Sequence, residues 1–183
     1  MVQEFVQQIH DSVEKQLNCI HTAIPGEIIA FDAVKGLATV KPVMKYRKPD
    51  GTTMDYPAVF GVPVVIPQSI SQKATIAFPI EKGDGCLLVF AEKSLDLWMY
   101  GQETDTDLHF DLSDAICIPG LFNKPNAILK EACEKKAVIV DVSGTKATVK
   151  SGAVQIDAQK ISLNGNVEIK GDLKVSGGTV YLN

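Results

Sequence analysis

Cysteine and histidine are scarce in this sequence of 183 residues, and their spacing removes several common kinds of site. The four cysteines, Cys19, Cys86, Cys117 and Cys133, stand far apart and form no Cys-x-x-Cys pair. No zinc ribbon or thioredoxin-type motif can therefore be identified. We expect four reduced thiols, some of them buried as small hydrophobic side chains.

Long apolar runs and a strong net charge are also missing. No apolar segment reaches the roughly 20 residues needed to span a bilayer. The first ten residues lack the basic start and continuous apolar run of a secretory signal. The formal net charge of −4 gives no overall attraction to nucleic acid or to anionic membranes. We therefore expect a soluble chain made in the cytosol, with room for one medium domain or two small ones.

Residues 2–22 are predicted to form an amphipathic helix, within an N-terminal segment 1–24. Apolar residues recur at spacings of three and four, which places them on one stripe. They are Val2, Phe5, Val6, Ile9, Val13, Leu17 and Ile20. Pro25-Gly26 ends the helix. Two interpretations stay open: the helix packs on its own domain, or it associates with copies of itself or with a partner.

From about Ile28, apolar residues recur at every second position. This alternation is typical of strands and predicts a small antiparallel barrel over residues 25–122. The predicted strands follow one another without a helical crossover: 27–31, 36–43, 59–66, 74–78 and 86–90. Pro49-Asp50-Gly51 combines a fixed φ with turn-forming residues and predicts a hairpin loop. A short helix over 126–136 is then expected inside a linker, 123–136.

The last segment, 137–183, contains short alternating pieces separated by Asn, Gly, Asp or Ser. The first residues of these pieces lie 7, 6, 6 and 7 positions apart, and such a repeat is typical of a β-helix or solenoid. One chain cannot close a core around so thin a stripe, whereas three chains around one axis can. The predicted core side chains are Val154, Ile156, Ile161, Leu163, Val167, Ile169, Leu173, Val175, Val180 and Leu182. The alternative is an ordinary β-meander in a globular domain.

Six short motifs occur in order along the barrel segment. They are Pro25-Gly26-Glu27-Ile28, 62–67, 78–84, 94–98, 112–115 and Pro119-Gly120. Together they resemble the N-terminal OB-fold domain of the central spike proteins of contractile phage tails and tailocins, over about residues 25–122. The repetitive C-terminus is similar to the same family, whose spikes are homotrimers ending in a triple-stranded β-helix. The expected fold is thus mainly β: an N-terminal helix, an OB-like antiparallel barrel and an intertwined trimeric β-helix.

This resemblance implies a homotrimer attached to a trimeric hub protein at the centre of the baseplate. The spike would pierce the envelope of the target cell, as part of a virion or tailocin particle assembled in the host bacterial cytoplasm. Many such spikes bind iron at the apex through a His-x-His pair from each chain. Here His10, His21 and His109 all precede the repeats. We therefore expect no metal site from this chain, and either a blunt end or a separate small tip protein.

The sequence lacks the common catalytic motifs, and we therefore do not expect an enzyme. No Gly-x-Ser-x-Gly elbow is present, and few histidines are available as a base. Gly83-Asp84-Gly85 lacks the spacing and following helix of a phosphate-binding loop and predicts a hairpin turn. Glu131 and Glu134 are expected on a solvated helix face, because so short a linker cannot build a glycosidase cleft. We expect no catalytic residues and no cofactor.

The alternative function is single-stranded nucleic-acid binding by the OB-like barrel. Its best support is a basic run with interleaved tyrosines, Lys41, Lys45, Tyr46, Arg47, Lys48 and Tyr56. The other large aromatics are expected in core or intersubunit packing rather than in a stacking platform. They are Trp98, Tyr100, Phe110 and Phe122. We expect no nucleic-acid partner.

Overall fold

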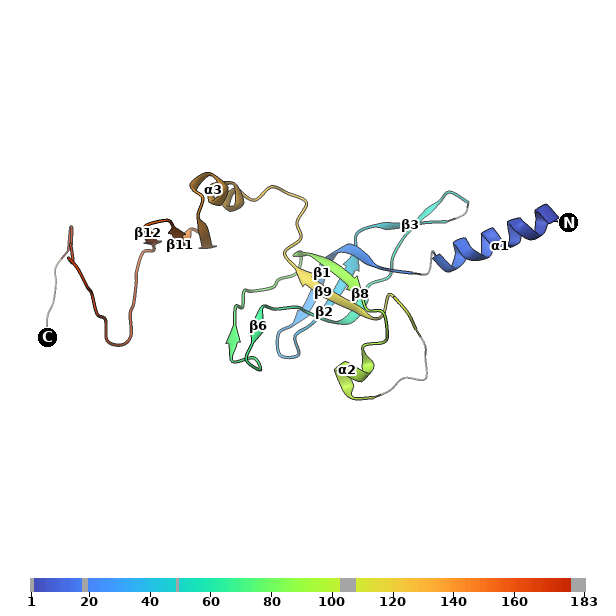
Figure 1. Ribbon diagram of the computed structural model, residues 1–183, viewed down its shortest axis with the longest axis horizontal. Helices are drawn as coiled ribbons and strands as arrows, with labels where there is room; N and C mark the ends of the chain where they lie inside the picture. The colour runs from blue at the N-terminus through green and yellow to red at the C-terminus, as the bar shows by residue number, and fades with distance from the viewer. Residues whose placement is uncertain (1, 18–19, 49, 103–107, 179–183) are drawn as a thin grey trace. The chain divides into compact units, whose positions relative to one another are not determined.

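The computed structural model describes residues 2–17, 20–48, 50–102 and 108–178, and the chain is mainly β (Figure 1). It divides into two compact units, Met1–Lys124 and Pro125–Asn183. The division falls inside the predicted linker, 123–136. Among the described residues, no helix combines the length and apolar character needed to cross a membrane.

Helix α1 (Val2–Leu17) is the amphipathic N-terminal helix. Its described apolar side chains, Phe5, Val6, Ile9, Val13 and Leu17, are each between 48% and 62% exposed. The helix ends at Leu17, before the predicted residue 22, and strand β1 begins at Ala23, which lies opposite Val89. The structure thus leaves the apolar stripe of α1 largely uncovered.

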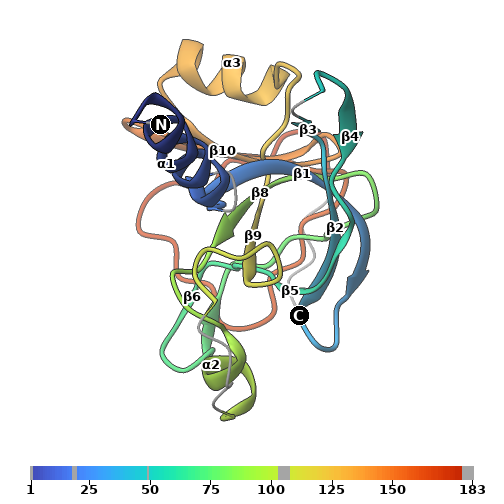
Figure 2. The ribbon, with the colours of Figure 1, turned by 90° about the vertical axis from the view of Figure 1, so that its right-hand side faces the viewer.

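Unit 1 is built on a five-stranded antiparallel sheet in the order β5-β2-β1-β8-β9. The strands are β1 (Ala23–Asp32), β2 (Leu37–Pro42), β5 (Val59–Pro63), β8 (Gly85–Phe90) and β9 (Ala115–Pro119). Just after β5, Val64 forms a parallel bridge with Cys117 of β9, and the Val65 N–H donates to the Cys117 carbonyl at 2.9 Å. The sheet therefore curls into a half-barrel, visible in Figure 2, which confirms a mainly β chain with a small antiparallel barrel-like sheet.

The core of the half-barrel comes from alternate residues of these strands. Strand β8 shows the pattern most clearly, because every second residue, Cys86, Leu88 and Phe90, is buried. The other core residues are Ile28, Ala38, Val40, Val59, Val62, Ala115 and Cys117. Cys86 and Cys117 are free thiols in this core, and Cys133 is an exposed free thiol, whereas Cys19 lies outside the described residues.

One predicted strand was misplaced and one was missed. Residues 74–78 contribute only β7 (Ala74–Thr75), which pairs with β6 (Gln68–Ser69) in a separate ribbon. Ile76 and Phe78 are 72% and 45% exposed, so this stretch adds nothing to the core. The fifth strand of the sheet is β9, which the sequence did not predict. Its apolar run is only four residues long before Pro119, and so short a run cannot be distinguished from a loop by its pattern alone.

Pro25 and Gly26 lie inside β1 rather than marking the end of the helix. The Pro25 carbonyl accepts from the Val43 N–H at 3.0 Å, beyond the last β1–β2 pair, Gly26–Pro42. The nitrogen and carbonyl of a strand residue point to the same side, so the missing N–H of Pro25 faces β2 at the end of the β1–β2 ladder and removes no hydrogen bond to β8. Gly26 is required for packing, because a Cβ there would lie 2.6 Å from Val40 Cγ1.

Unit 2 contains helix α3 (Ala127–Lys135) and an antiparallel meander of β10 (Val138–Val142), β11 (Thr145–Lys150) and β12 (Ala153–Asp157). These strands are longer than the predicted three-residue pieces. Among the described residues beyond β12, from 158 to 178, no strand pairing occurs. A single chain thus shows a meander followed by unpaired repeats, and the predicted β-helix is not shown by it.

Candidate functional site

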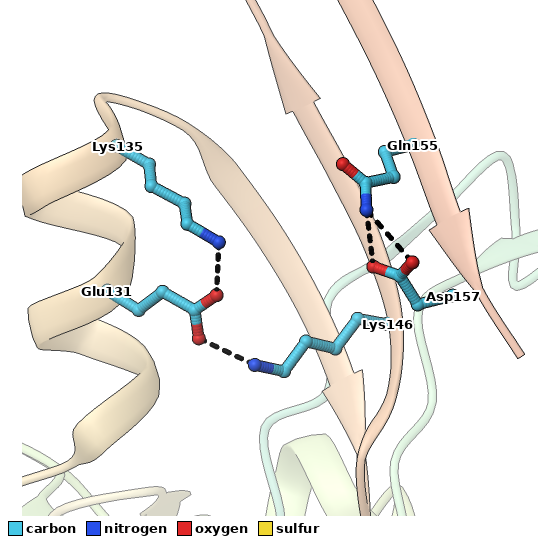
Figure 3. A network of polar contacts seen from close by, with 5 residues as sticks. All are labelled: Glu131, Lys135, Lys146, Gln155 and Asp157. Carbon is cyan, nitrogen blue, oxygen red and sulfur yellow. Dashed lines mark hydrogen bonds and ion pairs between the residues drawn. The ribbon is translucent and has the colours of Figure 1, made fainter.

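Helix α3 is fixed to the meander through Glu131. The Glu131 Oε1 accepts from Lys135 Nζ at 2.7 Å, and Oε2 accepts from Lys146 Nζ of β11 at 2.6 Å (Figure 3). These two ion pairs and hydrogen bonds lower the pKa of Glu131 to about 2. The expectation of a purely solvated face was therefore wrong for Glu131, whereas Glu134 makes an exposed pair with Lys130 at 3.7 Å.

The face of the meander beneath α3 is the more polar one. One row of cross-strand neighbours on this face consists of Asp141, Lys146 and Asp157. The neighbouring row on the same face contains Thr148, which is 7% exposed. Gln155 Nε2 donates to Asp157 Oδ1 at 2.9 Å on the same face (Figure 3). The helix therefore covers the charged side of the sheet over β10 and β11, whereas Gln155 and Asp157 of β12 stay exposed.

The opposite face of the meander is apolar and open. Its residues are Val138, Val140, Val142, Ala147, Val149, Val154 and Ile156, and we call this set the meander face. Its valines and isoleucine are each between 50% and 69% exposed. An amphipathic sheet normally buries its apolar side and leaves its polar side in water. Within one chain, this sheet instead leaves its apolar side open and has part of its polar side covered by α3.

The predicted trimer-core residues continue this apolar series. Val154 and Ile156 lie on β12, and the next six residues are each between 49% and 69% exposed: Ile161, Leu163, Val167, Ile169, Leu173 and Val175. Val180 and Leu182 lie outside the described residues. Exposed apolar side chains in such number are typical of an interaction site. The structure places the later repeats directly after three paired strands, β10 to β12, which all lie within the predicted needle segment, 137–183.

The basic hairpin of unit 1 consists of β3 (Lys45–Arg47) and β4 (Thr53–Asp55), joined as predicted by a turn at Asp50-Gly51. Lys41 and Lys45 both lie near the Asp55 carboxylate, at 3.6 and 3.7 Å. The Tyr46 and Tyr56 rings are packed edge to face, with centroids 6.4 Å apart. Two of the basic side chains are thus paired with Asp55, and the two tyrosine rings pack on each other. This leaves less positive charge and less aromatic surface for binding single-stranded nucleic acid.

The large aromatics assigned to packing lie mostly at the surface of the chain. Trp98 and Tyr100, on the short helix α2 (Asp96–Tyr100), are 75% and 62% exposed. Phe122 is also exposed, and Phe110 is half-buried. The prediction that these aromatic side chains lie in the core was therefore wrong for Trp98, Tyr100 and Phe122. The alternative, that they contact another subunit, stays a prediction.

Comparison with protein families identifies the first unit. Residues 24–120 match the family model described as the phage protein Gp138 N-terminal domain. The chain belongs to this family. The matched Gp138 N-terminal domain begins within β1 and ends just after β9, so it contains the whole half-barrel.

Membership in the Gp138 family makes the chain a phage structural protein associated with the virion. The meander and the repeats lie beyond the matched residues. No curated protein matches the chain. The half-barrel is thus the Gp138-type part of the molecule, and the open apolar face of the meander lies outside the matched residues.

The Glu131 ion pairs predict a pH-dependent attachment of α3. Because the folded-state pKa of Glu131 is lowered from 4.5 to about 2, its stabilising contribution is complete above pH 4.5 and is lost as the pH falls towards 2. In Glu131→Gln, hydrogen exchange of the amides of α3 should be faster than in the wild type at pH 7, and the difference should shrink below pH 4.5. Mass spectrometry of peptides covering α3 measures this.

Glu134→Gln serves as the matched control, because its carboxylate makes a long, exposed pair with Lys130. We expect exchange in this variant to match the wild type at every pH. Equal acceleration in Glu131→Gln and Glu134→Gln would contradict a specific role for Glu131.

Proposed function

We propose that this protein is the central spike of the baseplate of a contractile injection system, and that it acts as a homotrimer. The observation that carries the proposal is the uncovered apolar series that starts on β12 and runs through the unpaired repeats to residue 175. Three copies wound around one axis would bury these side chains and pair their backbone groups. The product would be a stiff β-helical needle able to pierce a cell envelope.

The half-barrel supports the attachment role in this proposal. A five-stranded, partly open barrel is the architecture of an OB-fold, and the Gp138 family supplies the phage context. We infer that three OB-like barrels seat the spike on a trimeric hub protein. Exposed aromatic side chains such as Trp98 and Tyr100 are suited to such contacts, since aromatic residues are enriched in protein interfaces.

A separate small tip protein completes the proposal. Residues 137–183 contain no histidine, so this segment offers no imidazole donors for an apical iron site. Unpaired N–H and C=O groups at the end of a β-helix would offer a docking surface for such a protein.

The proposed role is mechanical, and we expect no enzymatic turnover. The proposal rests on the absence from the sequence of a nucleophile motif with a matching base. The purified protein, incubated with peptidoglycan, should release no more soluble sugar than a buffer control. Sugar release that scales with protein concentration would overturn this part of the proposal.

Localisation within the particle tests the function directly. Antibodies against the half-barrel should label intact particles at the distal end of the tail, at the baseplate. Label on the capsid, or protein found only free of particles, would contradict a spike. Salt-dependent binding of the pure protein to single-stranded oligonucleotides would instead favour the alternative OB-fold function.

A further inference from the structure

We propose that the N-terminal helix α1 packs in parallel with the α1 helices of two other copies, as a three-helix bundle. This inference rests on the proposed homotrimer, but it concerns a helix that lies before the matched residues 24–120 and far from the needle segment. The contact is made by the apolar side chains that we call the α1 stripe: Phe5, Val6, Ile9, Val13 and Leu17.

The α1 stripe has no cover within the part of the chain that the structure describes. Its five side chains are each between 48% and 62% exposed. Helix α1 has 16 residues, and an isolated helix of about this length is only marginally stable in water. The stability of most protein helices comes from packing of their apolar face. Helix α1 therefore needs a partner for its stripe.

The charges of α1 narrow the choice of partner. The helix has three acidic residues and one basic residue: Glu4, Asp11, Glu14 and Lys15. A helix that lies on a membrane surface typically has Lys and Arg on its polar face, so this balance argues against a membrane. The α1 stripe itself contains no ionisable residue. Identical copies can thus bring their stripes together without like-charge repulsion.

The spacing of the apolar residues fits a bundle of three helices. Successive a and d positions of a heptad are occupied by Val6, Ile9, Val13 and Gln16. The apolar residues among them are all β-branched, and isoleucine at d favours assemblies of three or more helices over two. Phe5 and Leu17 flank this seam and widen the stripe to about 120° at about 100° per residue. Such a stripe exceeds the narrow seam of a two-stranded coiled coil.

Gln16 is the polar residue in this seam and favours a parallel, unstaggered arrangement. Three Gln16 side chains then share one layer, where each amide can both donate and accept a hydrogen bond. An antiparallel or shifted arrangement would bury the amide against valine or isoleucine without a partner, which is costly. A single polar core position of this kind commonly fixes the register of packed helices.

The attachment of α1 to the half-barrel also favours parallel helices. The His21 N–H donates to the Phe110 carbonyl at 3.1 Å, and the Thr22 carbonyl accepts from the Phe90 N–H at 3.1 Å. Only residues 18–20 lie between α1 and this anchor. Rotation about a common axis leaves the direction along that axis unchanged, so three copies would present their helices in the same direction. Such short tethers give effective concentrations of about the millimolar range.

Cross-linking of the full-length protein tests the proposal. The background is Cys19→Ser with Cys133→Ser, which keeps the buried Cys86 and Cys117. Val13→Cys in this background should give covalently linked chains on a denaturing gel after brief treatment with a short bismaleimide. The matched control is Gln8→Cys, at a position of α1 outside the stripe. We expect linkage of Val13→Cys to be about tenfold faster or more, because its thiols share one layer of the bundle.

The mass of the same variants separates this inference from the proposed function. A sedimentation mass of three chains with equal linkage of Val13→Cys and Gln8→Cys overturns the α1 bundle and leaves the spike proposal standing. A mass of three chains with faster linkage of Val13→Cys supports both. A mass of one chain overturns both.

Hydrogen exchange gives an independent readout. Ile9→Asp should lower the protection of the α1 amides by on the order of tenfold or more, because a carboxylate in the seam separates the helices and a lone helix of this length is marginal. The mass should stay at three chains, since the needle segment is unchanged. Gln8→Asp is the matched control and should keep the protection of the wild type. Equal loss of protection in Ile9→Asp and Gln8→Asp would contradict the proposal.

Discussion

Ile161→Asp is expected to abolish the trimer. In the proposed needle, three copies of residue 161 share one dry layer, so the variant would place three carboxylates close together without partners. The Ile161 side chain is 53% exposed in the single chain, so the substitution leaves the fold of each chain intact. Light scattering coupled to gel filtration should therefore report a folded single chain for this variant.

Ser162→Asp is the matched control, because side chains of adjacent residues in an extended strand point to opposite faces. A carboxylate at position 162 would face solvent in the proposed needle, and the trimer should persist. If Ile161→Asp and Ser162→Asp both retain the trimer, or if both lose it, the prediction that the Ile161 side chain points into the trimer core is wrong.

Leu88→Ala is expected to destabilise the half-barrel by about 2–5 kcal/mol. Leu88 is fully buried on β8, an interior strand of the sheet, and its removal leaves a cavity that the surrounding sheet cannot fill. A loss of this size is a large fraction of the roughly 5–15 kcal/mol that stabilises a typical domain. Urea unfolding followed by circular dichroism should show a much lower midpoint for the transition of unit 1.

Leu97→Ala makes the same chemical change at a side chain that is 56% exposed on α2. The expected change in stability is within about 0.5 kcal/mol, as is usual at surface positions. Equal shifts of the unfolding midpoint in Leu88→Ala and Leu97→Ala would contradict the assignment of the core.

The sequence predicted most of the half-barrel because its strands alternate buried and exposed residues. Strand β8 is the clearest case, and the start of β2 and the hairpin turn at Asp50-Gly51 were also placed correctly. Strand β9 was missed since its short apolar run acquires strand character only by pairing with β8. Local pattern cannot report such long-range pairing.

The open apolar surface of unit 2 was only partly predictable. The six- or seven-residue spacing of the repeats identified the apolar series from Val154 onwards, and the structure leaves its described members exposed. The run Val138-Ile139-Val140 gave no such signal, because a continuous apolar stretch does not indicate which face is buried. That choice depends on α3 and on the Glu131–Lys146 ion pair, which spans fifteen positions of sequence.

The mass of the purified full-length protein in solution tests the central claim most directly. Sedimentation equilibrium at micromolar concentration should give about three times the chain mass of 19.8 kDa, because three copies around one axis would bury the apolar repeats that a single chain leaves exposed. A stable mass of 19.8 kDa, unchanged as the concentration rises, would contradict the account.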